Sequence, residues 1–213
     1  MADYAALKKK VDELAERVWD IDGIKARVNR MTKEGIPKKK LDPKEMLAKK
    51  SEILDRVQLR AEEYNFICKN CAKSTALALM EEFGLGNMEI IKALTVFPGI
   101  GGTGNICGGI TGALIAFGLF YGSDDPLDQS IMEDPLKNPM ITAQKYIASF
   151  KDTIGAIHCT DIIENVILGH RLNPGESKQA MIEFTKEKGF EKCGLPPGLG
   201  ARTAADFMIN SLQ

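Results

Sequence analysis

The chain has 213 residues, of which 44% are hydrophobic and 27% are charged. This length is sufficient for one sizeable domain with a buried core, and the hydrophobic fraction is too high for an intrinsically disordered protein. The formal net charge of −1 excludes a protein that is basic throughout. The charge is unevenly distributed, however, because residues 1–60 contain 16 Lys or Arg against 11 Asp or Glu.

The N-terminal residues contain no apolar segment followed by a small-residue cleavage site, so no secretory signal is expected and the cytoplasm is the predicted compartment. Reducing conditions there favour metal ligands or redox-active thiols over structural disulfides. The candidates are the five cysteines, Cys68, Cys71, Cys107, Cys159 and Cys193.

The first 63 residues have the pattern of two helices. From Tyr4 to about Met31, apolar residues recur at spacings of three and four, which predicts an amphipathic helix; they are Leu7, Val11, Leu14, Val18, Ile21 and Ile24. The pattern ends at Gly35-Ile36-Pro37, and the next helix has an N-cap at Asp42, a proline at Pro43 and a capping-box glutamate at Glu45. We therefore expect an antiparallel helical hairpin that is basic and ends near residue 63.

The remainder, residues 64–213, has few strand signals. Helical patterns cover residues 72–83, 88–97, 106–121, 142–153, 160–168, 177–189 and 203–212. The acidic, proline-containing stretch 123–139 is expected to be a long surface loop. The predicted fold class is all-α, a multi-helix bundle with an N-terminal helical hairpin, divided into a hairpin domain (1–63) and a cysteine-containing domain (64–213).

The centre of the chain is uncharged from Ala93 to Ser123. A membrane span is not expected, because its continuous apolar part, residues 106–121, is only 16 residues long and follows a glycine-rich loop whose backbone would be unpaired in lipid. Small residues recur every fourth position in this region, so that another helix or a flat cofactor could approach closely; they are Gly104, Gly108, Gly112 and Ala116. Helix packing is the preferred interpretation over direct cofactor contact.

The glycine-rich loop delivers Cys107 to the beginning of a helix. Free amides and the helix dipole favour negative charge at that position. We therefore expect the Cys107 thiol to ionise more readily than a free cysteine. An inert buried cysteine is the alternative.

The residues Asn70-Cys71-Ala72, the segment Cys107-Gly108-Gly109-Ile110-Thr111-Gly112-Ala113, Cys159 and Cys193 together resemble the C_GCAxxG_C_C family of redox-active proteins. The resemblance covers roughly residues 64–213. It implies a small, mostly helical protein of an anaerobe whose four family cysteines are Cys71, Cys107, Cys159 and Cys193. Gly109 replaces the alanine that is usual in the motif, and the N-terminal hairpin and Cys68 have no counterpart in short members.

The resemblance implies that the four cysteines bind an iron–sulfur cluster, [2Fe–2S] or [4Fe–4S], and transfer electrons to or from a redox partner protein or a small-molecule substrate. A cluster-free thiol–disulfide oxidoreductase is the second hypothesis, because Cys68 and Cys71 have C-x-x-C spacing with Lys69 and Lys73 nearby to lower a thiol pKa. The third is a non-catalytic helical accessory protein with a structural metal such as zinc. The sequence does not determine whether the protein is an enzyme.

Two further expectations concern accessory residues and partners. His158 directly precedes Cys159 and could serve as an alternative ligand or proton donor. The basic hairpin is not expected to bind nucleic acid, because its positive charges alternate with acids and it has few aromatics for base stacking. Its apolar stripe is expected to pack across the core or against a second subunit, which predicts a homo-oligomer.

Overall fold

A computed structural model describes residues 2–128, 130 and 138–212 of the chain. The described residues form helices and contain no strand, only an isolated antiparallel bridge between Ile106 and His158. This confirms the all-α prediction. In chain order the elements are α1 (Tyr4–Glu16), α2 (Ile21–Glu34), α3 (Pro43–Ala48), α4 (Lys50–Cys68), α5 (Cys71–Phe83), α6 (Met88–Ala93), the 3-10 helix η1 (Leu94–Val96), α7 (Gly99–Gly102), α8 (Gly108–Tyr121), α10 (Pro139–Ile154), α11 (Cys159–Ile162), the π-helix η2 (Ile163–Ile167), α12 (Lys178–Lys186), α13 (Gly189–Lys192) and α14 (Leu195–Asn210).

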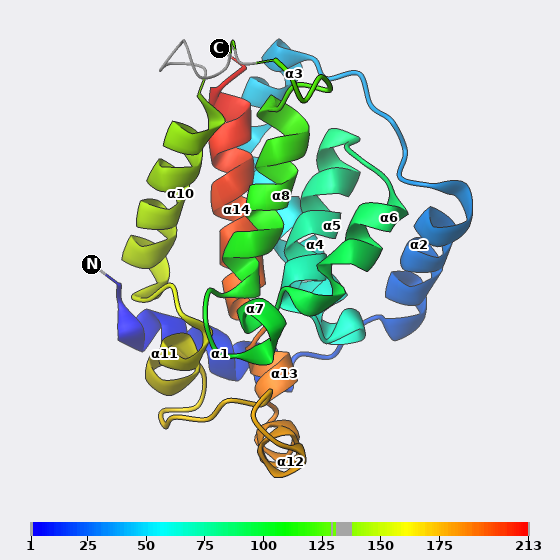
Figure 1. Cartoon of the computed structure of the whole chain (residues 1–213). Coiled ribbons are helices and arrows are strands. Elements are labelled where there is room, and N and C mark those ends of the chain that lie inside the picture. The colour runs from blue at the N-terminus through cyan, green and yellow to red at the C-terminus, as the bar shows by residue number, and fades with distance from the viewer. Residues whose placement is uncertain (1, 129, 131–137, 213) are drawn as a thin grey trace.

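Four helices form the centre of the bundle. Helix α4 packs against α5 and α14, and α8 packs against α5 and α14, so these four share one core. In Figure 1 they stand upright, with α10 on one side and α6 and α2 on the other, while α1, α7, α11 and α13 lie at the lower end. Helices α5, α8 and α14 all begin at this lower end, which brings their N-termini together.

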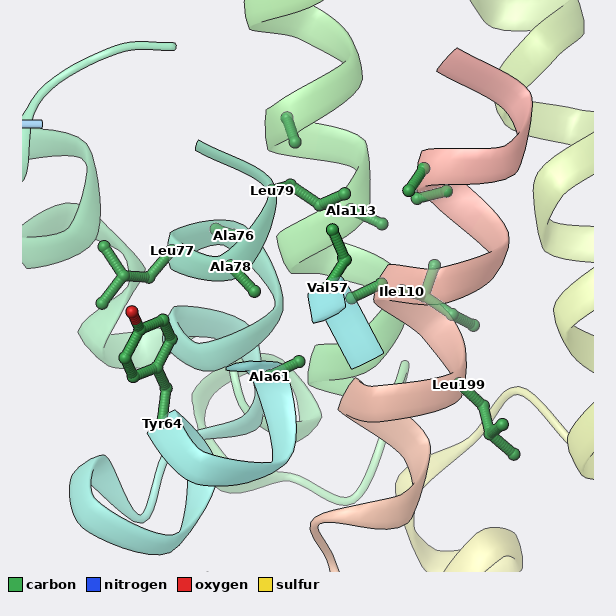
Figure 2. Packing of buried hydrophobic residues seen from close by; sticks show 14 of the residues in the cluster. Val57, Ala61, Tyr64, Ala76, Leu77, Ala78, Leu79, Ile110, Ala113 and Leu199 are labelled. Carbon is green, nitrogen blue, oxygen red and sulfur yellow. The ribbon is translucent and has the colours of Figure 1, made fainter. Parts of the chain in front are cut away.

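The core between these helices combines aliphatic and aromatic side chains. Figure 2 shows Val57, Leu79, Ala113 and Ile110 close together between the helices, with Tyr64 near Leu77 on another side. The contributors labelled there are almost completely buried, and they are Val57, Ala61, Tyr64, Ala76, Leu77, Ala78, Leu79, Ile110, Ala113 and Leu199. Burial of this apolar surface is the main source of the free energy that holds the bundle together.

The small residues of α8 allow other backbones to approach, as the packing interpretation predicted. A Cβ atom at Gly112 would collide with the Ala72 carbonyl oxygen and lie 2.9 Å from Thr75 Cβ. On another face, a Cβ at Gly109 would lie 2.9 Å from the Pro196 carbonyl oxygen of α14. Real Cβ atoms do not make contacts this close, so α5 and α14 can pack against α8 in this way only because the side chains are missing.

The predicted helix over residues 4–31 is in fact two helices. The Asp20 side chain accepts a hydrogen bond from the Gly23 amide (3.0 Å) and starts α2 as its N-cap. An aspartate inside a helical pattern competes in this way for free amides. The interruption leaves Val18 95% exposed, although the apolar spacing predicted that it would be buried.

The start of the next helical region follows the predicted signals only in part. Asp42 accepts hydrogen bonds from the amides of Lys44 and Glu45, and Pro43 occupies the first turn of α3. The Glu45 side chain does not complete a capping box, because it pairs with Lys49 instead (2.8 Å).

Helix α4 then continues to Cys68, beyond the predicted end at residue 63, and packs within the central bundle. The predicted boundary between residues 63 and 64 therefore lies inside α4, and the helix is continuous across it. The division into two domains stays a prediction.

The acidic stretch 123–139 is described only in part. Residues 123–128 form turns rather than a helix, as expected for a loop, whereas Pro139 already belongs to α10. The predicted loop residues Glu133 and Asp134 lie outside the described residues. In the described part of the chain, none of the helices combines the length and the apolar character that a bilayer crossing requires.

Candidate cysteine site

Cys71 is the first residue of α5, where the preceding residues form a tight junction with α4. Lys69 ends α4 in the left-handed conformation, with φ at 50°. Asn70 is the N-cap of α5; its side chain accepts a hydrogen bond from the Lys73 amide (3.0 Å) and donates one to the Thr95 carbonyl (3.2 Å). This junction places Cys71 at the start of α5, with its sulfur against Gly108 of α8.

Cys107 and Cys159 are held together by backbone pairing of their segments. The Cys107 amide donates to the Ile157 carbonyl (2.9 Å), and the Cys159 amide donates to the Asn105 carbonyl (2.7 Å). Cys107 is the N-cap of α8, as predicted, and Cys159 is the first residue of α11. Residues 52 positions apart in sequence thus become direct neighbours in space.

Cys193 reaches the same end of the bundle from the C-terminal side. It caps the C-terminus of α13, where its amide donates to the Gly189 carbonyl (2.8 Å), and α14 begins two residues later. The buried Asn65 of α4 donates to the Phe190 carbonyl (3.0 Å) and ties α13 to the central bundle.

Three of these sulfur-bearing side chains border one small cavity of about 80 Å³. The walls are predominantly apolar. The lining residues are Asn65, Lys69, Cys71, Pro98, Cys159, Ile163, Pro174, Phe184, Phe190 and Cys193. Cys107 does not line the cavity, but it is buried and its thiol is hydrogen-bonded to the Cys71 sulfur. The structure therefore brings together all four cysteines of the predicted set.

Gly108 makes this arrangement sterically possible. A Cβ atom at this position would collide with Cys71 Sγ and would lie only 2.6 Å from the Ala72 amide nitrogen. The glycine that follows Cys107 thus leaves the space that the Cys71 sulfur occupies. Gly104 has a related function in the preceding loop, where φ is 81° and a Cβ would collide with Thr160 Cγ2.

The electrostatics of Cys71 and Cys107 differ from the prediction. The hydrogen bond from Cys107 lowers the pKa of Cys71, and it outweighs burial with help from backbone amides that include those of Gly108 and Ala72. The same hydrogen bond, together with burial and the charge on Cys71, raises the pKa of Cys107 well above its ordinary value. The expectation that Cys107 ionises readily was wrong, because it donates to its neighbour and the helix-start amides do not compensate.

The other two thiols are also more difficult to ionise than a free cysteine. Burial, followed by repulsion from Cys71, raises the pKa of Cys159 to about 12. Burial and repulsion from Cys159 and Cys71 raise the pKa of Cys193 well above its ordinary value. Each thiol therefore responds to charge on its neighbours, and a cation among them would favour loss of their protons.

A family model described as "Putative redox-active protein (C_GCAxxG_C_C)" matches residues 69–195. The chain belongs to this family. The match begins at Lys69, immediately before the first family cysteine, and ends at Leu195, two residues after the last. It covers Cys71, Cys107, Cys159 and Cys193. No curated protein and no solved structure matches the chain.

Within this C_GCAxxG_C_C protein, the accessory candidates do not join the cavity. Cys68 is the last residue of α4 and does not line the cavity; burial raises its pKa, and Lys73 opposes that effect only weakly. His158 is exposed and borders a separate polar recess with Asp161 and Arg171. The C-x-x-C spacing thus does not identify the partner of Cys71, which is Cys107.

Sequence reasoning missed the aromatic wall of the cavity. Phe184 and Phe190 form an edge-to-face pair with ring centroids 5.2 Å apart. The Lys69 ammonium lies over Phe190 and over Phe66, at 5.6 and 4.5 Å from the ring centroids, and pairs with Glu191 (3.0 Å). No local motif distinguishes these phenylalanines from ordinary core residues, so only the fold could reveal them.

The four cysteines are of a residue type that binds metals, but their side chains are not arranged around one metal ion. Among the residues that the structure describes, no three or more Cys, His, Asp or Glu side chains are arranged around a single metal position. Three thiols from separate elements nevertheless border one apolar cavity, with Cys107 buried beside Cys71, and thiolates are the ligands of iron–sulfur clusters. Because a cluster assigns its ligands to several irons, its sulfur ligands need not surround one point. The type of ligand therefore suits a cluster.

Proposed function

We propose that Cys71, Cys107, Cys159 and Cys193 hold an iron–sulfur cluster, through which the protein passes electrons to or from a redox partner or small substrate. The observation that carries this proposal is that three thiols, distant in sequence, border one predominantly apolar cavity, while the fourth, Cys107, lies buried beside Cys71. Membership of a family described as redox-active supports it. When bound, the cluster would supply one-electron transfer within the potential range of such centres.

The residues of this chain would have distinct tasks in binding it. Cys71 and Cys107 approach from the rigid helices α5 and α8, whereas Cys159 and Cys193 approach from the short elements α11 and α13. Phe184 would exclude water from one side of the cavity. Apolar surroundings and hydrogen bonds to the sulfurs adjust the reduction potential of such a centre.

Anaerobic reconstitution with ferrous iron and sulfide tests the proposal. We expect a brown protein with charge-transfer absorption in the visible range and with iron and acid-labile sulfide in comparable amounts. Cys193→Ala should lose this absorption, whereas Cys68→Ala should retain it, because Cys68 does not line the cavity. A protein that remains colourless but binds zinc tightly would instead support the structural-metal hypothesis.

The remaining sequence predictions stay predictions. The cavity has no bearing on four of them: the homo-oligomer, the anaerobic source, the cytoplasmic location and the identity of the electron partner. Size-exclusion chromatography with light scattering would test the oligomeric state. For the alternative function, a thiol–disulfide oxidoreductase, the candidate pair of cysteines changes from Cys68 and Cys71 to Cys71 and Cys107, because Cys71 interacts with Cys107.

A further inference from the structure

The contact between Cys71 and Cys107 has the features of a pair that can form a disulfide. The Cys71 sulfur lies directly beside the residue that follows Cys107, because a Cβ at Gly108 would collide with Cys71 Sγ. Their backbones are also close, because a Cβ at Gly108 would lie 2.6 Å from the Ala72 nitrogen. A disulfide requires closely spaced backbones with side chains that point toward each other.

The two members of the pair differ in their access to small molecules. Cys71 lines the cavity of about 80 Å³, whereas Cys107 is only 4% exposed and is not part of the cavity wall. A molecule in the cavity can therefore reach Cys71, as it can Cys159 and Cys193, but it does not reach Cys107 directly. A cavity needs a volume of at least about 10 to 15 Å³ to hold one water molecule. The cavity beside Cys71 is several times larger, so it can hold a molecule of a few heavy atoms.

We propose that, in protein that holds no metal, a small hydroperoxide enters this cavity and oxidises Cys71 and Cys107 to a disulfide. This activity does not require that a cluster ever forms, so it goes beyond the proposed function. Hydrogen peroxide matches the size of the cavity. Disulfides of peptide size do not, which distinguishes this reaction from exchange with a peptide disulfide.

The reaction has two balanced steps. First, the Cys71 sulfur forms a bond to one peroxide oxygen and the O–O bond breaks; the thiol becomes a sulfenic acid, and the other oxygen leaves as water with the thiol proton. Second, the Cys107 sulfur bonds to the Cys71 sulfur and displaces the sulfenic oxygen, which leaves as water with the Cys107 proton. Two thiols and one hydrogen peroxide thus give one disulfide and two waters.

The geometry favours this pair over the other cavity cysteines. The Cys71 sulfur lies against Gly108, the residue that follows Cys107, because a Cβ at Gly108 would collide with Cys71 Sγ. Cys107 and Cys71 also start neighbouring long helices that pack closely. A disulfide between them would therefore need little movement of the backbone.

The test uses the full chain, purified with a chelator and reduced, and exposed to one equivalent of hydrogen peroxide without oxygen. We expect the number of titratable thiols to fall from the five of the sequence to three. Digestion without reductant and mass spectrometry should identify one cross-link, between residues 71 and 107. A cross-link that joins other cysteines, or loss of thiols without a cross-link, would overturn the proposal.

Variants separate the two steps. Cys107→Ser should stop after the first step, so that a 1,3-diketone probe labels Cys71 as a sulfenic acid. Cys71→Ser should lose the peroxide reaction, whereas Cys68→Ala should react like the unmodified chain. Cross-link mapping in the unmodified chain keeps the proposal testable if a variant fails to fold, and equal peroxide reactivity in Cys71→Ser and the unmodified chain would contradict it. Cluster binding is assayed separately with iron and sulfide, so failure of one proposal does not imply failure of the other.

Discussion

The centre of the bundle and its cysteine-containing end are built in different ways. In the centre, long helices bring small, aliphatic and aromatic residues into direct contact, and the side chains are almost fully buried. At the other end, short helices and a π-helix border a cavity. The comparison indicates that the bundle supplies stability, while the end, which is less regular, presents the reactive side chains.

The two regions meet at the first turn of α8. Gly108 leaves room for the Cys71 sulfur at the cysteine end, and one turn later Gly112 leaves room for the Ala72 carbonyl within the bundle. The same repeat of glycines therefore serves both packing and the site. Mutations in the two regions should have different consequences, and the following predictions test that difference.

The largest effect on stability is expected for Phe117→Ala in the centre. Phe117 is buried and contacts the rings of Tyr121, Tyr146 and Phe207. Removal of a buried aromatic side chain costs about 3 to 5 kcal/mol of unfolding free energy, which urea denaturation would measure. Leu127→Ala is the control, because Leu127 is 83% exposed and should change little. Equal effects of the two substitutions would contradict the assignment of stability to this core.

Smaller changes in the free energy of unfolding, opposite in sign to each other, are expected for alanine substitutions at two glycines of α8. Gly112→Ala should destabilise the protein by about 1 to 3 kcal/mol, because the added methyl group overpacks the contact with α5. Gly118→Ala should stabilise it by about 0.5 to 1 kcal/mol, because nothing lies within 4 Å of the new Cβ and alanine favours the helix. Thermal unfolding of both variants measures the difference. Destabilisation by both would show that helix flexibility, and not packing, determines the result.

At the cysteine end, Cys193→Ala should affect stability less than Phe117→Ala does. Its side chain borders an existing cavity, so few packing contacts are lost, and we expect a cost of about 1 kcal/mol, typical of single substitutions. Urea denaturation of the metal-free variant would measure it. A cost as large as that of Phe117→Ala would indicate that the cysteine end is itself part of the stabilising core.

The smallest effect concerns a surface contact next to the cysteine end. Hydrogen bonding to Glu187 at 3.0 Å is the largest contribution that raises the pKa of His170. The pKa of His170 is higher in the folded protein than in the unfolded chain, so its pair with Glu187 stabilises the fold fully at pH values below the ordinary histidine pKa. This stabilisation is lost as the pH rises through the pKa of His170 in the folded protein. The difference in thermal midpoint between the unmodified chain and His170→Gln should therefore shrink with rising pH through the neutral range. A difference that does not depend on pH would show that the pair makes no contribution through charge.

Much of the fold could be predicted from local signals. Asp42 with Pro43 marked a helix start, and the four-residue spacing of Gly108 and Gly112 indicated close helix packing. Such features depend on residues within one or two helical turns. The break at Asp20 was missed, because the apolar stripe runs through it and the choice of an N-cap depends on where the two halves can pack.

The sequence could predict which cysteines belong to the site, but not how their side chains lie relative to one another. The sequence by itself determined which cysteines belong together and that Cys107 begins a helix, because these follow from a family motif and from local helix signals. Only the tertiary structure decided that Cys71 faces Cys107, that Cys68 is excluded from the cavity and that Phe184 and Phe190 form its wall. It also decided which thiol ionises more readily, because burial and hydrogen bonding depend on neighbours that are distant in sequence.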